Sequence, residues 1–433
     1  MITAGLSLEQ APPFGVPLRF FLTAPWFLVL AAALVAWQGP EIFASRWLPA
    51  TLALTHLLVL GFMALVMLGA LLQMLPVVVG VIVPWPRLTA TLIHIPLTLG
   101  VLTLVRAFLS GIPVWFQAAW WLLGLGFSVA LTTIHLALWR APVASGTVIA
   151  LRCALVALLA TVGIGLLLGG FFGWGWRLPV VTMVHLHVAW GLIGWTVLLV
   201  AGVAYQVIPM FQITPPYPAR FVRGFVPLMA ALLVIWSVFA LNDLETATEL
   251  ASVAVAVGVA LFALTTLHLL ARRRRKIGDP TLIYWRTSMI SLLAGAVFWL
   301  LGLLVPALRQ MPQVDLLLGV LVIFGFAVAV INGMLYKIVP FLVWLHLQRI
   351  NQRRFAIPNM KQILAETAQR RQLWLHTAAL LLLLQALAWP TRPGCVLAGV
   401  AVIAAQLWLG WNLLGAARLY RTTAARIRSA PPA

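Results

Sequence analysis

Long apolar runs recur along the whole chain, and only short polar segments separate them. About 20 apolar residues are needed to cross the hydrocarbon core of a bilayer as an α-helix. The composition agrees with this pattern, since 63% of the 433 residues are hydrophobic and 8% are charged, whereas about a quarter of an ordinary soluble domain is charged. The sequence therefore predicts an all-α polytopic membrane protein.

Twelve transmembrane helices are expected, all within a single transmembrane domain over residues 1–433. Residues 1–17 contain no Lys or Arg, so the first run is expected to be an uncleaved membrane anchor and not a signal peptide. The predicted helices begin near Leu18, Trp47, Leu88, Pro113, Thr147, Arg177, Gly224, Leu250, Leu282, Asp315, Gln372 and Pro393.

The formal charge of +20 follows from where the basic residues lie. If the N-terminus is inside, 23 of the 28 Lys and Arg fall in or beside inner segments. Such a bias is typical of cytoplasmic loops. We therefore expect a bacterial-type inner membrane protein with both termini in the cytoplasm, a lipid bilayer as its surroundings and no nucleic-acid partner. The five outer basic residues are Arg46, Arg106, Arg177, Arg309 and Arg392.

The longest inner segment, residues 347–372, is expected to be a basic cytoplasmic loop. Within it, Met360, Ile363, Leu364 and Ala368 recur at helical spacing among basic residues. This pattern indicates an interfacial helix that contacts lipid headgroups or a partner. The alternative is a solvated basic loop that only follows the positive-inside rule.

A glycine motif, G-x7-G-x3-[Q/K]-x2-P, appears once in each third of the chain. Its spacing predicts three pseudo-symmetric four-helix units over about 18–140, 147–272 and 282–418. A second repeat supports this prediction, because Thr132–Leu136 and Thr265–Leu269 are nearly identical. The three copies are Gly61, Gly69, Gln73 and Pro76; Gly194, Gly202, Gln206 and Pro209; and Gly325, Gly333, Lys337 and Pro340.

The small residues of the motif allow neighbouring helix backbones to approach closely in lipid. The proline interrupts the backbone hydrogen bonds, so Gln73, Gln206 and Lys337 are expected to line an inner cavity or to satisfy the freed groups. Packing alone is the alternative for the two glutamines. A lysine inside a span is costly and indicates a function for Lys337.

Three of the eight histidines, His56, His185 and His187, lie in the outer half of predicted spans two and six. His56 and His185 occupy equivalent faces of these helices, and His187 points to another face because two residues turn a helix by about 200°. Intramembrane histidines line cavities, pair with partners or bind metals. They predict a heme or copper site, with hydrogen bonds between helices as the alternative. The two cysteines, Cys153 and Cys395, are too far apart in the sequence to indicate a site.

The run His56-x4-Gly61-x7-Gly69-x6-Pro76 is similar to a motif of the NnrS family of heme- and copper-containing membrane proteins. His185-Leu186-His187 is similar to the paired histidines of heme-copper oxidases. The whole pattern resembles subunit I of those oxidases. The resemblance implies heme, copper, a diatomic gas ligand and a redox partner. It also implies a membrane oxidoreductase acting on nitric oxide or oxygen.

In that class, His56 and His185 are expected to be axial or metal ligands on facing helices. His187 is expected to bind a second centre or to orient the first. A cofactor-free permease or channel is the main alternative, although no Asp or Glu lies deep in a predicted span. A third hypothesis is an assembly or sensory protein that binds its partner through Arg349 to Arg371.

Overall fold

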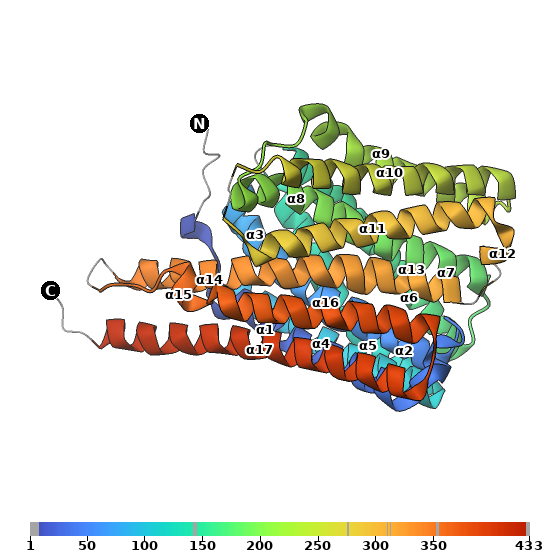
Figure 1. Cartoon of the computed structure of the whole chain (residues 1–433), viewed down its shortest axis with the longest axis horizontal. Helices are drawn as coiled ribbons and strands as arrows, with labels where there is room; N and C mark the ends of the chain where they lie inside the picture. Colours follow the sequence, from blue (N-terminus) through green and yellow to red (C-terminus); the bar gives the residue numbers. More distant parts are fainter. Residues whose placement is uncertain are drawn as a thin grey trace.

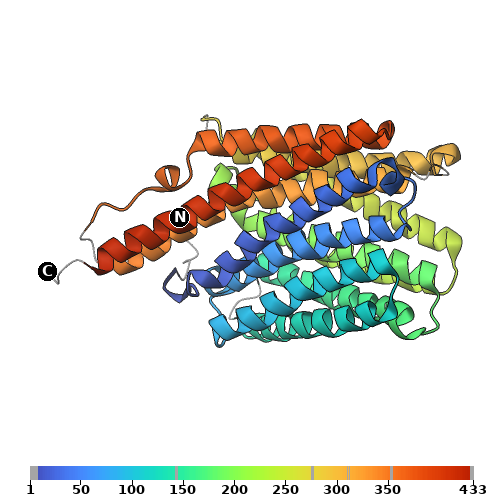
Figure 2. The same ribbon diagram turned by 90° about the horizontal axis from the view of Figure 1, so that it is seen from below.

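A computed structural model describes residues 8–141, 145–274, 277–309, 311, 313–351 and 355–429. Within these ranges the chain is helical and contains no β-strand, and the long helices run side by side as one bundle (Figures 1 and 2). The long helical segments are α1 (Gly15–Gln38), α2 (Pro49–His56) to α3 (Leu65–Met74), α4 (Pro86–Ser110), α5 (Pro113–Trp139), α6 (Gly146–Trp174), α7 (Val180–Ala189) to α8 (Leu198–Gln212), α9 (Ala219–Leu241), α10 (Glu245–Ala271), α11 (Pro280–Leu304), α13 (Gln313–Gly319) to α14 (Ala329–Asn351), α16 (Glu366–Ala388) and α17 (Arg392–Arg428).

Eleven helices of the described chain are long and apolar enough to cross a membrane, which makes this a multi-pass membrane protein. The helix outside that set is α16, which occupies the place of the span expected near Gln372. It begins six residues earlier, at Glu366, and carries Arg370 and Arg371 in its first two turns. The predicted starts of the other spans are closer to the observed ones.

Helix boundaries follow from local chemistry. Prolines stand at the first position of α2, α4, α5 and α11, where the missing N–H costs no helical hydrogen bond. Gly111 and Gly175 end α4 and α6 with positive φ angles of 68° and 71°, a conformation that glycine adopts without strain.

Three of the spans are interrupted by π-helical segments at matching places. The segments are η3 (Leu57–Ala64), η5 (Trp190–Val197) and η6 (Val320–Val328), and each contains the first glycine of one motif copy. They join α2 to α3, α7 to α8 and α13 to α14. Segments η3 and η5 both contact η6, so these three spans meet inside the bundle. π-Helical turns are rare in proteins as a whole, and those that do occur are often found at functional sites.

The glycines of the motif lie where helices approach closely, as the sequence predicts. A methyl group at Gly69 would come within 2.7 Å of Phe20 Cβ, and one at Gly61 would overlap the Phe27 ring. Both phenylalanines belong to α1. The other two copies behave alike: Gly194 and Gly202 pack on Ala157 and Ala150 of α6, and Gly325 and Gly333 pack on Ser291 and Tyr284 of α11.

Contacts between the remaining helices continue around the bundle. Helices α4 and α5, α9 and α10, and α16 and α17 pack in pairs. The second member of each pair also packs on a further helix, namely α5 on α6, α10 on α11 and α17 on α1. The contact of α17 with α1 is visible in Figure 2, where the last long helix crosses beside the first.

The expected basic loop is shorter in the structure. Helix α14 continues to Asn351, and residues 352–354 lie outside the described residues. Of the interfacial helix expected within Asn359–Arg371, Ala368 belongs to α16, and the remainder is the single turn α15 (Met360–Ile363), which is capped by Asn359. Ile363 and Leu364 are buried in the core, so this turn packs on the protein through these side chains.

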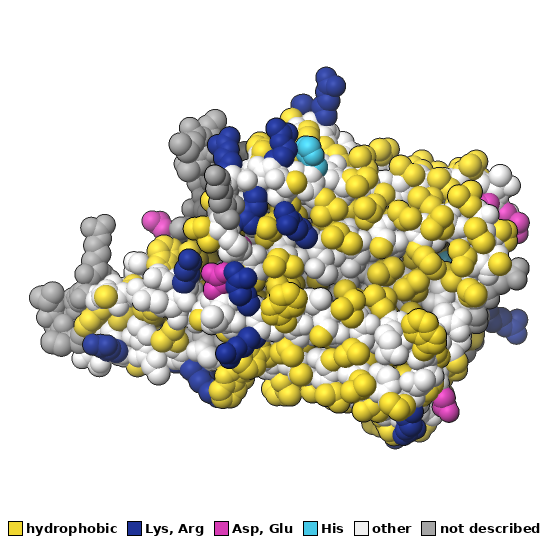
Figure 3. Space-filling view, viewed as in Figure 1, with side chains coloured by type: hydrophobic (Ala, Val, Ile, Leu, Met, Phe, Trp, Pro, Cys, Tyr) yellow, Lys and Arg dark blue, Asp and Glu magenta, His cyan; other side chains and the backbone are white. Residues whose placement is uncertain are grey.

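The surface separates apolar and basic regions. Apolar side chains cover the middle of the visible face, and most Lys and Arg on it lie toward the end of the bundle where α1 begins and α17 ends (Figure 3). Exposed tryptophans include Trp37, Trp85, Trp139 and Trp389. Tryptophans are enriched at the two membrane–water boundaries.

Candidate functional site

His56 is the last residue of α2 and directly precedes the π-helical segment η3. Its Nδ1 lies 2.7 Å from the backbone oxygen of Leu52, one turn earlier. A carbonyl oxygen only accepts hydrogen bonds, so Nδ1 carries the proton. The Nε2 atom of the neutral ring is then left with its lone pair, which is the form that binds metals.

His187 lies on α7 and has the same arrangement. Its Nδ1 donates to the backbone oxygen of Thr161 on α6, at 3.0 Å. Gly165, one turn along α6, leaves room for the imidazole, because a methyl group there would come within 2.9 Å of His187 Cε1. The helix next to His187 therefore both orients the ring and makes space for it.

The two imidazoles face each other across the helices. Their ring centroids are 6.3 Å apart and their planes differ by 21°, and Phe108 of α4 packs on the His56 ring at 5.2 Å. Two imidazoles that bind one metal through Nε2 at about 2.0–2.1 Å each have centroids roughly 5 to 6.5 Å apart, and the largest separation belongs to rings on opposite sides of the metal. The separation therefore lies in the range of two imidazoles that share one metal, and the fixed tautomers leave both Nε2 lone pairs available.

His185 lies elsewhere. Its side chain is exposed, and its Nε2 accepts a hydrogen bond from Arg46 at 2.8 Å. Arg46 also forms an ion pair with Asp315, with 3.2 Å between Nε and Oδ2. The structure thus brings together His56 and His187, whereas the sequence paired His56 with His185. The reason is the rotation of α7, since two residues turn a helix by about 200°.

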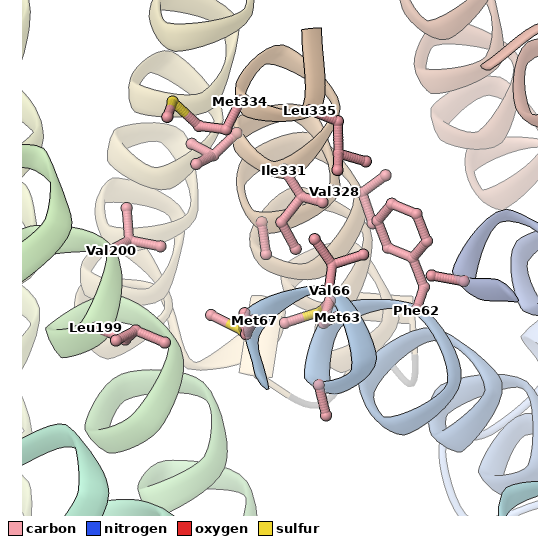
Figure 4. Packing of buried hydrophobic residues seen from close by; sticks show 14 of the residues in the cluster. Phe62, Met63, Val66, Met67, Leu199, Val200, Val328, Ile331, Met334 and Leu335 are labelled. Carbon is pink, nitrogen blue, oxygen red and sulfur yellow. The ribbon is translucent and has the colours of Figure 1, made fainter. Parts of the chain in front are cut away.

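The protein donors around the pair are few. Across the described residues, no group of three or more His, Cys, Asp and Glu is placed to hold a metal ion. Met63 is fully buried among the side chains of Figure 4, and Met183 packs in a small cluster with Trp190. A metal held here would have His56 and His187 as its two imidazole ligands.

A large apolar cavity of about 470 Å³ lies beside the histidine pair. Leu52 and Thr55 of α2 and Val184 and Val188 of α7 line it, while the two imidazoles themselves do not. Arg46 and Asp315 contribute its charged groups. The cavity reaches η6 through Ile323 and Phe324, so it lies where the spans with π-helical segments meet.

A second cavity, of about 180 Å³, is lined by the other halves of the same spans. Gln73 of α3 and Gln206 of α8 both line it, and Lys337 is not among its lining residues. We call it the inner cavity and the larger one the outer cavity. Phe62, Met63 and Val328 line neither cavity, and Figure 4 shows the closely packed side chains of this region.

Lys337 forms an ion pair with Asp279, with 2.7 Å between Nζ and Oδ2. Asp279 caps α11, and its Oδ1 accepts hydrogen bonds from the backbone and hydroxyl of Thr281. Gln212 of α8 donates to the Thr281 hydroxyl at 2.9 Å. Burial raises the pKa of the Asp279 carboxyl, but Lys337 and Thr281 outweigh it, so the net pKa lies below the usual value.

Several residues of these sites have no functional role in the sequence analysis, among them Arg46, Leu52, Thr161, Gly165 and Asp279. The sequence does contain a signal for the position of Asp279, because an Asp directly before a proline favours the start of a helix. The start of α11 lies beside Lys337 of span ten. Thr161 acts through its backbone oxygen, which no sequence pattern marks.

Comparison with models of known protein families and with curated proteins finds no match to this chain.

Proposed function

We propose that this chain is a membrane protein that binds a heme or a copper ion through His56 and His187. The observation that supports this most is the pair of imidazoles 6.3 Å apart, each with its Nδ1 proton directed at a backbone oxygen. Bound there, heme iron or copper would supply electron transfer and binding of a diatomic gas. The proposal places this chain in the class of NnrS-like and heme-copper oxidase-like membrane proteins.

The residues of this chain have defined roles in the proposal. The backbone oxygens of Leu52 and Thr161 fix both imidazoles with Nε2 directed away from them. Such partners of metal-bound histidines set the tautomer and orient the ring. The apolar outer cavity next to the pair suits a small uncharged ligand such as nitric oxide or oxygen, which reaches the site through lipid. A redox partner would deliver electrons.

The proposal includes three four-helix units in the arrangement of heme-copper oxidase subunit I. It is supported by the three π-helical segments, which begin at Leu57, Trp190 and Val320. It is also supported by the glycine contacts, which in each unit join the second span to the first. The sequential packing of α5 on α6, α10 on α11 and α17 on α1 has the same period.

We further propose a bacterial-type inner membrane with both termini in the cytoplasm. The first and last long helices, α1 and α17, begin and end at the same end of the bundle (Figure 1). Most of the basic residues on the visible face gather toward that end (Figure 3). This distribution favours the cytoplasmic side for that end.

The test is a reduced-minus-oxidised visible spectrum with metal analysis of the detergent-purified full-length protein. His56→Ala and His187→Ala are expected to remove most of the heme or copper. His185→Ala is the matched control two residues away on the same helix, and it should keep the cofactor because its imidazole is bound to Arg46. Size-exclusion chromatography and circular dichroism confirm folding of each variant.

Two results would overturn the proposal. One is a colourless and metal-free protein from cells that are replete in heme and copper. The other is a full cofactor content in His56→Ala and His187→Ala, which would place the cofactor elsewhere.

A cofactor-free permease is the second candidate, and the two cavities favour it. They lie in series along the same three spans, and the layer with Phe62, Met63 and Val328 separates them. A transporter alternates access to a site near the middle of the membrane. This candidate predicts a colourless protein that moves a solute into proteoliposomes.

A further inference from the structure

The inner cavity has the properties of a small-molecule site distinct from the histidine pair. It measures about 180 Å³ and lies among α3, α8 and α14, with Trp285 of α11 in its wall. Its lining is almost wholly apolar and includes Met67, Met74, Met210 and Met334. No charged side chain is among its lining residues.

The only buried polar group in this wall whose partners are missing is the Gln73 amide. Gln73 is 6% exposed, and neither its Oε1 nor its Nε2 has a hydrogen-bond partner in the described protein. An unsatisfied buried polar group destabilises a protein because it loses its hydrogen bonds to water and gains none in return. Native proteins therefore satisfy nearly all of them, with protein, water or ligand. A second amide, Gln206 of α8, lines the same cavity.

The size of the cavity limits its occupant. An engineered apolar cavity of about 150 Å³ stays dry and binds benzene. A space of about 180 Å³ with apolar walls therefore accepts a molecule of about one aromatic ring. Thioether and aromatic side chains such as those of Met67 and Phe341 pack well on such rings.

We propose that the inner cavity binds a small neutral molecule of about one ring, which carries one hydroxyl or amide group for Gln73. A charged ligand is excluded, because the apolar wall offers no countercharge. Met210 is 42% exposed and lines the cavity, so the wall reaches the surface near the end of α8. The site requires neither His56 nor His187, and its test is independent of the cofactor.

The test is 19F NMR of 4-fluorophenol, fluorobenzene and 4-fluorobenzoate with the full-length protein in lipid nanodiscs. The wild type is expected to bind 4-fluorophenol about tenfold more tightly than fluorobenzene, the factor that one hydrogen bond supplies. 4-Fluorobenzoate is expected not to compete. Empty nanodiscs measure how much of each probe dissolves in lipid.

Three variants assign the binding to this cavity. Gln73→Met keeps the approximate shape of the side chain. It should remove the preference for 4-fluorophenol over fluorobenzene, while fluorobenzene still binds. Ala70→Phe fills the cavity and should weaken both probes. Gln406→Met is the matched control, since Gln406 is fully buried with an unpartnered amide but lines neither cavity.

The proposal is wrong if the wild type binds 4-fluorophenol and fluorobenzene equally, because the Gln73 amide is then satisfied by water or not at all. It is also wrong if Ala70→Phe leaves both affinities unchanged, since the probes would then bind elsewhere.

Discussion

The imidazole of His187 is held in place by the helix beside it. Thr161 accepts its Nδ1 proton, and Gly165 leaves the ring its space. A methyl group at position 165 would lie 2.9 Å from Cε1 and 3.9 Å from Nε2 of this ring, so the ring would have to move. This makes Gly165 a positioning residue for the proposed cofactor.

Gly165→Ala is therefore expected to lower the ratio of cofactor to protein by about tenfold, the usual loss when the support of a metal ligand is disturbed. Gly163→Ala is the matched control on the same helix, because nothing lies within 4 Å of a methyl group there. The visible spectrum and metal content of both variants are compared. Equal cofactor content in the two would show that the ring does not depend on this space.

The ion pair of Lys337 and Asp279 makes a prediction for stability. Lys337→Met removes the ammonium group from beside the Asp279 carboxylate, whose side chain is 4% exposed, while Thr281 still donates hydrogen bonds to it. We expect a loss of about 2–3 kcal/mol, at or below the lower end of the range for buried pairs, because Lys337 is itself 22% exposed and Thr281 remains a partner of the carboxylate. The double variant Lys337→Met/Asp279→Asn should recover most of that loss. Thermal unfolding in detergent measures both; equal stability of the two variants would contradict the prediction.

The same pair sets a pH dependence. The pKa of Asp279 is lowered in the folded protein, so its contribution is fully present above the unfolded pKa of about 4 and is lost as the pH falls through the folded pKa. The stability difference between wild type and Lys337→Met should therefore be constant from pH 8 to about pH 5 and shrink in more acidic solution. A difference that instead shrinks as the pH rises from 5 to 8 would contradict this assignment.

At the scale of residues, the sequence singled out His56, His185 and His187 as candidate ligands, but it did not predict which side chains they contact. His56 and His187 were recognised because imidazoles are costly in lipid. Which of His185 and His187 meets His56 depends on the rotation of α7, which is set by packing on α6. The apolar run around Lys337 marks this lysine as costly, but it does not reveal Asp279, which lies outside the run at the start of α11.

The elements of the fold were predicted more completely than its residue contacts. Apolar run lengths and punctuating prolines located the long helices, because a bilayer fixes their length. The π-helical segments were not predicted. Spans two, six and ten are buried on most sides, so apolar residues occur all around these helices. An extra residue in one turn therefore causes no visible shift of an apolar stripe along the sequence.

Close packing of the glycine motif gives a prediction at the scale of the element. A methyl group at Gly202 would lie 2.5 Å from Ala150 Cβ, so Gly202→Ala should push α8 away from α6 and destabilise the protein by about 1–3 kcal/mol. Gly224→Ala in α9 meets nothing within 4 Å and should be neutral or stabilising by up to about 1 kcal/mol. Thermal unfolding of the two variants provides the measurement. A stable Gly202→Ala would show that the helices can separate freely.

Orientation in the membrane is a property of the whole molecule. In a background with Cys153→Ala and Cys395→Ala, Thr246→Cys marks the start of α10 and Thr422→Cys marks the last turns of α17; both positions are exposed. A membrane-impermeant maleimide added to sealed spheroplasts should label Thr246→Cys and not Thr422→Cys. Labelling both after lysis is the control. The reverse pattern would place the basic end outside, against the charge bias.

The residue spacing of the glycine contacts can also be used to recognise distantly related sequences. In each copy, glycines eight residues apart lie against positions seven residues apart on the neighbouring helix, as with Gly61 and Gly69 against Phe27 and Phe20. A π-helical turn holds about one residue more than an α-helical turn. The eight-residue stretch with the π-helical turn can therefore span the same length as the seven-residue stretch of the neighbouring helix. Eight against seven, three times at intervals of about 130 residues, is thus a numerical signature of this backbone. Such a count survives when residue identities have diverged, because backbone geometry sets it and side-chain chemistry does not.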